Sequence, residues 1–115
     1  MRVAPPLLLL GAGALLCATA PGRPGDGLEH GRAVYAARCA ACHGRALEGV
    51  DEMPALVGAR FQAKWRGREA ALAAKVRLSM PQDDPGSLAP ADAAEVATLV
   101  LAANHLPAPP PMRSR

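Results

Sequence analysis

The sequence predicts an all-α fold in a single domain. Alanine, a strong helix former that strands disfavour, accounts for 26 of the 115 residues. Three segments carry apolar residues at helical spacing, and no segment alternates apolar and polar residues for long enough to form a strand. A chain of this length is ordinarily one domain. A β-sandwich, a β-barrel and a multidomain protein are therefore excluded.

The first two expected helices have clear boundaries. The first begins near Asp26, which has capping-box spacing to Glu29, and it leads the chain to Cys39. The second covers about residues 69–78, is mostly alanine, and must end before Pro81.

The third expected helix begins at Pro90 and ends before Pro107. A proline is favoured in the first turn, and Asp92 complements the positive end of the helix dipole. The residues that repeat at helical spacing are Ala93, Val96, Leu99, Val100 and Ala103.

Residues 1–20 have the pattern of a signal peptide. Arg2 precedes an apolar run, and Ala18-Thr19-Ala20 closes it with small residues. We expect export to the periplasm, with no transmembrane span after cleavage and a membrane tether if the segment is kept. Residues 21–27 are expected to be a linker, residues 28–106 the folded domain, and residues 107–115 a Pro-rich tail.

Large apolar side chains are scarce, which affects stability. The chain has only three aromatic residues, Tyr35, Phe61 and Trp65. Alanine buries little apolar area, so a domain of this size needs a covalent staple, a metal or a cofactor to hold its fold.

The formal net charge of +3 does not support nucleic-acid binding. The basic and acidic residues nevertheless lie in different parts of the chain. They could form two solvated faces, or the basic residues could form a docking surface or a lid over anionic groups. Apart from Glu69, the segment from residue 60 to 77 carries only basic charges: Arg60, Lys64, Arg66, Arg68, Lys75 and Arg77.

The sequence Cys39-Ala40-Ala41-Cys42-His43 has the spacing of a c-type haem attachment site. Two thiols one helical turn apart can reach the two vinyl groups of one porphyrin, and the adjacent imidazole then ligates the iron. A thioredoxin-like pair would need a βαβ unit. A zinc site would need a fourth ligand, for which only His30 and His105 remain. A structural disulfide would leave the histidine unexplained.

Met80 is the preferred sixth iron ligand. Pro81 forces the preceding residue into an extended conformation, from which Met80 can project inward. A thioether with histidine gives a six-coordinate iron suited to electron transfer. The other candidates are Met53, Met112, His30 and His105.

Most of the predicted domain resembles class I cytochrome c, the small monohaem family. The residues that carry the resemblance are Gly31, Tyr35, 39–44, Leu47, Gly49, 54–58, Phe61, Met80-Pro81 and the last amphipathic helix. Residues 61–65, 80–88 and 103–107 are more similar to bacterial cytochromes that accept electrons from quinoprotein dehydrogenases. The sequence departs from the family at Leu99, where an aromatic residue is common, and at Ala89, where a Ser or Thr cap is expected.

The resemblance implies three main helices and Gly/Pro-rich loops around one covalently bound haem c. It implies that Gly31 lies where the first and last helices cross, and that the Pro54 carbonyl accepts the His43 ring proton. Trp65 and one or two arginines would contact the haem propionates. The implied function is one-electron transfer from a quinoprotein dehydrogenase or another donor to a terminal oxidase, without enzymatic activity. The alternatives are a peroxidase or ligand sensor with a displaceable Met80, and a non-haem thiol or zinc module.

Overall fold

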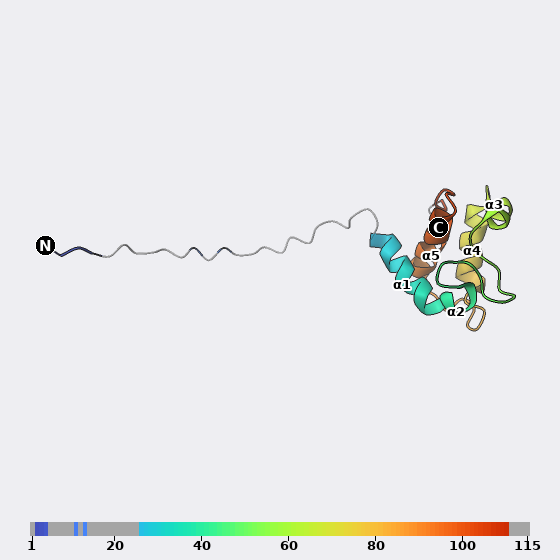
Figure 1. The fold of residues 1–115 in the computed structure, drawn as a ribbon, viewed down its shortest axis with the longest axis horizontal. Coiled ribbons are helices and arrows are strands. Elements are labelled where there is room, and N and C mark those ends of the chain that lie inside the picture. The colour runs from blue at the N-terminus through green and yellow to red at the C-terminus, as the bar shows by residue number, and fades with distance from the viewer. Residues whose placement is uncertain (1, 5–10, 12, 14–25, 111–115) are drawn as a thin grey trace.

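The computed structural model describes residues 2–4, 11, 13 and 26–110. This part of the chain forms helices and no strand, so the predicted all-α class is confirmed (Figure 1). The helices are α1 (Asp26–Arg38), α2 (Ala40–His43), α3 (Ala59–Trp65), α4 (Glu69–Ser79) and α5 (Pro90–Ala103).

The three predicted helices correspond to α1, α4 and α5. The starts of all three and the end of α4 agree with the expected boundaries to within one residue, whereas α5 ends at Ala103, well before Pro107. The short helices α2 and α3 were not predicted. With 4 and 7 residues, they are too short for periodicity to identify them. Helix α3 is stabilised by tertiary packing, because its Phe61 and Trp65 are buried.

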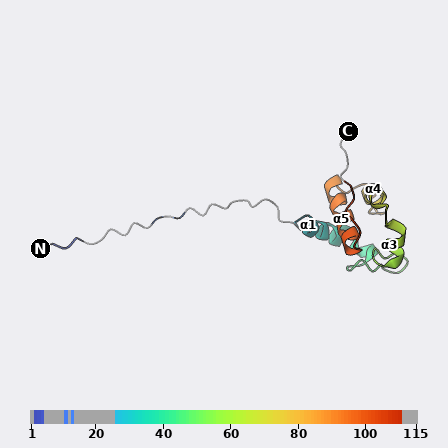
Figure 2. The same ribbon diagram turned by 90° about the horizontal axis from the view of Figure 1, so that it is seen from above.

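The first and last helices cross closely at Gly31 (Figures 1 and 2). A Cβ atom on Gly31 would come within 2.8 Å of the Glu95 carbonyl oxygen, so only glycine lets the two backbones approach this far. Beside the crossing, His30 Nε2 lies 2.8 Å from Asp92 Oδ1. The hydrogen bond with Asp92 and the charge of Glu95 raise the pKa of His30.

Helix α5 is the centre of the fold, because it packs against both α1 and α4. Ala89 precedes it without a side-chain cap, as the sequence suggested, and Leu99 is buried where the family often has an aromatic residue. The buried residues of α5 are Ala93, Val96, Ala97, Leu99, Val100 and Leu101.

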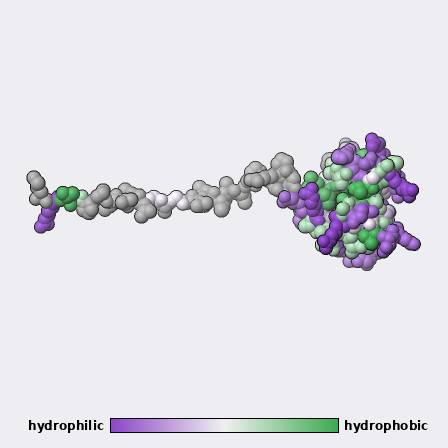
Figure 3. All heavy atoms as spheres, in the orientation of Figure 1, coloured by the Kyte–Doolittle hydropathy of each residue, from purple (hydrophilic) through white to green (hydrophobic). Residues whose placement is uncertain are grey.

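The predicted signal peptide lies outside the described residues except for positions 2–4, 11 and 13. Helix α1 begins at Asp26, so the helical part of the domain starts two residues inside the segment expected to be a linker. Leu106 is buried, and most of the described residues after it are exposed. None of the described helices is long and apolar enough to cross a membrane. Hydrophilic side chains cover much of the visible face of the domain, with smaller apolar areas between them (Figure 3).

We expect Gly31→Val to destabilise the protein by about 1–3 kcal/mol, because the new side chain would push α1 away from the backbone of α5. Thermal unfolding of the haem-loaded protein measures the effect. Ala33→Val introduces the same β-branched residue at an exposed position of α1 and should change the midpoint much less. Equal effects of the two substitutions would show that the crossing is not tightly packed.

Candidate functional site

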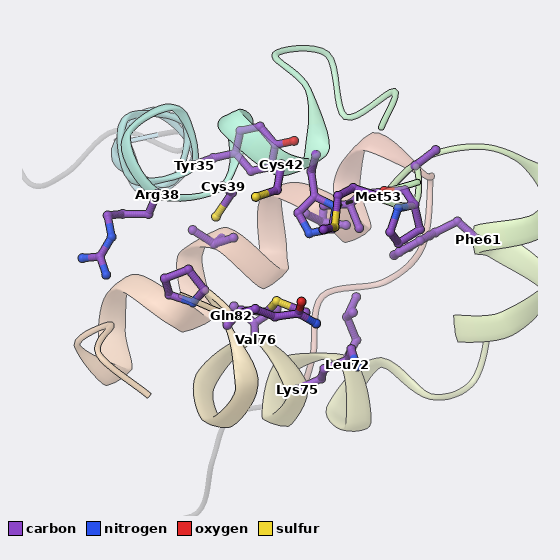
Figure 4. Close-up of a pocket in the computed structure, with 18 of the residues that line it drawn as sticks. Tyr35, Arg38, Cys39, Cys42, Met53, Phe61, Leu72, Lys75, Val76 and Gln82 are labelled. Carbon is purple, nitrogen blue, oxygen red and sulfur yellow. Dashed lines mark hydrogen bonds between the residues drawn. The ribbon is translucent and has the colours of Figure 1, made fainter. Parts of the chain in front are cut away.

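A cavity of 990 Å³ lies between the segment that carries the cysteines and the wall formed by α4 (Figure 4). Its volume is at the upper end of the range for small-molecule and cofactor pockets, which is roughly 300–1,000 Å³. All three aromatic residues of the chain line it, together with aliphatic side chains of α4 and α5. The cavity therefore has the apolar character that a porphyrin requires.

Cys39 and Cys42 both line the cavity and are free thiols. Cys39 lies between α1 and the single turn of α2. A hydrogen bond of 2.9 Å from the His43 backbone N–H to the Cys39 carbonyl oxygen helps to close this turn. Cys39 is buried, and burial raises the pKa of its thiol. Cys42 is exposed, so the two residues that line the cavity differ in burial.

The His43 ring is held in one orientation by the loop that follows it. Its Nδ1 lies 3.0 Å from the Pro54 carbonyl oxygen. A carbonyl oxygen can only accept a hydrogen bond, so Nδ1 carries the proton and Nε2 keeps the lone pair that a metal needs. The hydrogen bond implied by the family resemblance is thus present.

Tyr35 supports the backbone next to His43. Its hydroxyl donates a hydrogen bond of 2.6 Å to the Gly44 carbonyl oxygen. Burial, with smaller contributions from Cys39 and Glu48, raises the pKa of Tyr35 to about 12, so the hydroxyl remains a donor at neutral pH. This role of Tyr35 was not predicted, because its partner is a backbone carbonyl that the sequence does not reveal.

Asn104 fixes the loop that carries Pro54, and sequence analysis did not identify this role. It is 2% exposed. Its Nδ2 donates to the carbonyl oxygens of Leu56 and Val100, both at 2.8 Å, and its Oδ1 accepts from Gly58 N at 3.2 Å. A polar amide after an apolar helix is the only signal in the sequence.

Met80 directly follows α4 with φ −113° and ψ 150°, the extended conformation predicted from Pro81. It is half-buried and lines the cavity. Met53 also lines the cavity, but it lies on the wall that carries Cys42, whereas Gln82 lies on the α4 wall with Val76 (Figure 4). Because Met53 shares its wall with the cysteines, Met80 is better placed to face His43.

The remaining ligand candidates lie elsewhere. His30 is at the α1–α5 crossing, and His105 follows α5 with an exposed side chain. Neither lines the cavity. Met112 lies outside the described residues.

The basic segment divides into two groups. Arg60, Lys64 and Lys75 line the cavity, and Arg66, Arg68 and Arg77 do not. Lys64 and Arg68 lie 5.2 Å and 5.3 Å from the centre of the Trp65 ring. With Arg38 also in the lining and Asp83 as its only acidic member, the cavity wall is positive and suits a group that carries carboxylates.

Together, the helical fold, the paired thiols and the oriented imidazole facing an apolar cavity define a class I c-type cytochrome. Residues 26–100 match the family described as cytochrome c oxidase, cbb3-type, subunit III, and the chain belongs to this family. Membership implies a covalently bound haem c and haem-based electron transfer.

The fold is also similar to a solved structure, the sulfane dehydrogenase SoxCD from Paracoccus pantotrophus. The TM-score is 0.57 and the sequence identity is 22%, so the likeness concerns the fold alone. The match covers 79% of this chain and 60% of the other, which means that this protein spans less than two thirds of its neighbour's length. A comparison with curated proteins finds no match.

We expect Asn104→Leu to destabilise the protein by about 2 kcal/mol or more, because it leaves buried backbone groups of the loop unpaired. If Asn104 also positions Pro54, the His43 Nδ1–H proton should exchange faster with solvent, as measured by NMR. Thr98→Val is the matched control, because it removes a hydrogen bond of 2.9 Å to Ala94 within the same helix. Loss of stability with unchanged proton exchange would limit Asn104 to a structural role.

Proposed function

We propose that the protein is an exported electron carrier with one haem c, held covalently by Cys39 and Cys42 and ligated by His43 and Met80. The main support for this proposal is the hydrogen bond between His43 Nδ1 and the Pro54 carbonyl oxygen, which leaves Nε2 unprotonated. His43 and Met80 both line the cavity. Haem c supplies an iron that alternates between the ferric and ferrous states, so one electron is carried at a time.

The chain's residues have separate tasks in this proposal. Cys39 and Cys42 would hold the porphyrin next to His43 through thioether bonds, each formed by addition of a thiol to a vinyl group. The Pro54 carbonyl keeps the imidazole oriented, and the aromatic side chains exclude water from the cavity. Arg60, Lys64 and Lys75 would neutralise the propionates, because they are the cations of the basic segment that line the cavity.

The proposed partners are a dehydrogenase as donor and a terminal oxidase as acceptor. The fold similarity to a subunit of a sulfane dehydrogenase supports a dehydrogenase, and the resemblance of residues 80–88 to cytochromes that serve quinoprotein dehydrogenases favours that class. Export to the periplasm rests on the pattern of residues 1–20. We propose a carrier and not a peroxidase or ligand sensor, because Met80 lines the cavity in an extended conformation and would serve as a second protein ligand that keeps substrates from the iron.

Met80→Ala should leave the haem covalently attached but open its sixth position. We expect carbon monoxide or imidazole to bind readily, the reduction potential to fall, and the methionine charge-transfer band of the ferric spectrum to disappear. Absorption spectra of protein produced with haem maturation measure all three when recorded with added ligand and during redox titration.

Met53→Ala is the control for this substitution, because Met53 also lines the cavity but is 43% exposed. It should keep the spectrum of the unmodified protein. If Met53→Ala opened the iron and Met80→Ala did not, the ligand assignment would be wrong. A high-spin spectrum of the unmodified protein would favour the peroxidase or sensor, and the absence of a Soret band would favour a thiol or zinc module.

The outward-facing part of the basic segment should guide an acidic partner. We expect Arg66→Glu to slow electron transfer several-fold at low salt without changing the spectrum, because charges at the edge of a weak interface act mainly on the association rate. The rate should also fall as the ionic strength rises. Stopped-flow kinetics with an acidic redox partner measure both effects.

Arg32→Glu makes the same charge change at an exposed position of α1 and should have a smaller effect. Asp84→Lys reverses a charge in the acidic pair Asp83-Asp84, which follows Met80 in the sequence. If the rate is independent of ionic strength, or if Asp84→Lys slows the reaction as much as Arg66→Glu, the basic segment is only a solvated surface.

A further inference from the structure

A second cluster of potential metal ligands lies outside the cavity, beside the crossing of α1 and α5. It consists of His30 from α1 and of Asp92 and Glu95 from α5. His30 Nε2 lies 2.8 Å from Asp92 Oδ1 and 3.6 Å from Glu95 Oε2. One ligand atom from each residue lies within 4.8 Å of the other two. None of these residues lines the haem cavity.

One oxygen of this cluster has no hydrogen-bond partner. Glu95 Oε2 is buried and accepts no hydrogen bond. Only one proton on His30 Nε2 is available for the two carboxylates, and the shorter distance assigns it to Asp92. A buried carboxylate oxygen without a partner is costly. The oxygen faces the imidazole nitrogen at 3.6 Å, where a cation could join both atoms.

The distances between the ligand atoms and the ligand types suit zinc or a similar divalent transition-metal ion. Zinc binds imidazole nitrogen and carboxylate oxygen at about 2.0–2.1 Å in a tetrahedron, which places neighbouring ligand atoms about 3.3 Å apart. The two measured separations from His30 Nε2, 2.8 Å and 3.6 Å, lie on either side of this value. The His30 side chain is 55% exposed, so an ion can enter and water can complete the coordination.

The backbone fixes these ligands in place before any ion binds. Asp92 and Glu95 are three residues apart on α5, so they share one face of that helix. Gly31, the neighbour of His30, meets the backbone of Glu95 itself at the crossing. The distance between the imidazole and the carboxylates is therefore set by the closest contact between the two helices.

We propose that His30, Asp92 and Glu95 form a binding site for a divalent ion of the zinc class, separate from the haem. The ion would join the first and last helices of the domain. It would stabilise the folded protein, because the three ligands are brought together only when α1 and α5 cross. The site is structural, and it requires no change at the haem iron.

Calorimetric titration of the tag-free, haem-loaded protein with zinc chloride tests this proposal. The protein is first treated with a chelator, and the titration is run at about pH 8, because the ion binds the unprotonated imidazole and the carboxylates raise the pKa of His30. We expect saturable binding of one equivalent and a higher midpoint of thermal unfolding with zinc than without it. The haem spectrum should not change, which separates this test from that of the proposed function.

His30→Asn should abolish both the binding and the increase in the midpoint. His105→Asn is the matched control, because it removes an exposed histidine outside the cluster and should retain both effects. Asp92→Asn should weaken binding without removing a residue from the core. The proposal is overturned if the unmodified protein shows no saturable binding, or if zinc affects the His30 and His105 variants equally.

Discussion

The constraint on which the structure depends is that its aromatic side chains, although buried, line a cavity and do not fill it. Tyr35, Phe61 and Trp65, all the aromatic residues of the chain, line the same 990 Å³ space. The alanine-rich helix α4 adds only two buried residues, Leu72 and Val76, and both line the same cavity. A porphyrin in contact with these walls would therefore be part of the hydrophobic core, so attachment of the haem and stability of the fold are coupled.

The cavity is positioned by two helices that are far apart in the sequence. From α1, the Tyr35 hydroxyl holds the Gly44 carbonyl and so fixes the backbone directly after His43. After α5, Asn104 holds the backbone at Leu56 and Gly58, and the same loop presents the Pro54 carbonyl to the imidazole. The orientation of one ring nitrogen thus depends on both ends of the domain. The glycine contact at the α1–α5 crossing keeps these ends at a fixed distance.

Features that depend on neighbouring residues could be predicted from the sequence, and features that depend on contacts between distant residues could not. Pro81 determines the backbone of Met80 through a local steric clash, so its extended conformation could be predicted. Helix α5 could be predicted from its length, its first-turn proline and its apolar face. The hydrogen bonds of Asn104 join it to residues 46 and 48 positions earlier, and His30 lies 62 positions from Asp92. Such pairs have no local pattern, because only the three-dimensional path of the loops and helices brings them together.

The cavity, the helix crossing and the exposed residue Arg66 involve different residues, so each can vary separately. The potential of the iron depends on its axial ligands, on hydrogen bonds to them and on the apolar lining. These groups lie in the cavity, whereas His30, Asp92 and Glu95 lie beside the helix crossing and outside the lining. Arg66 is exposed and also lies outside the lining, so it can contribute to partner docking without contact with the haem. With Gly31 kept, substitutions of His30, Asp92 or Glu95 can therefore change stability, and substitutions at Arg66 can change association rates, without altering a residue that lines the cavity.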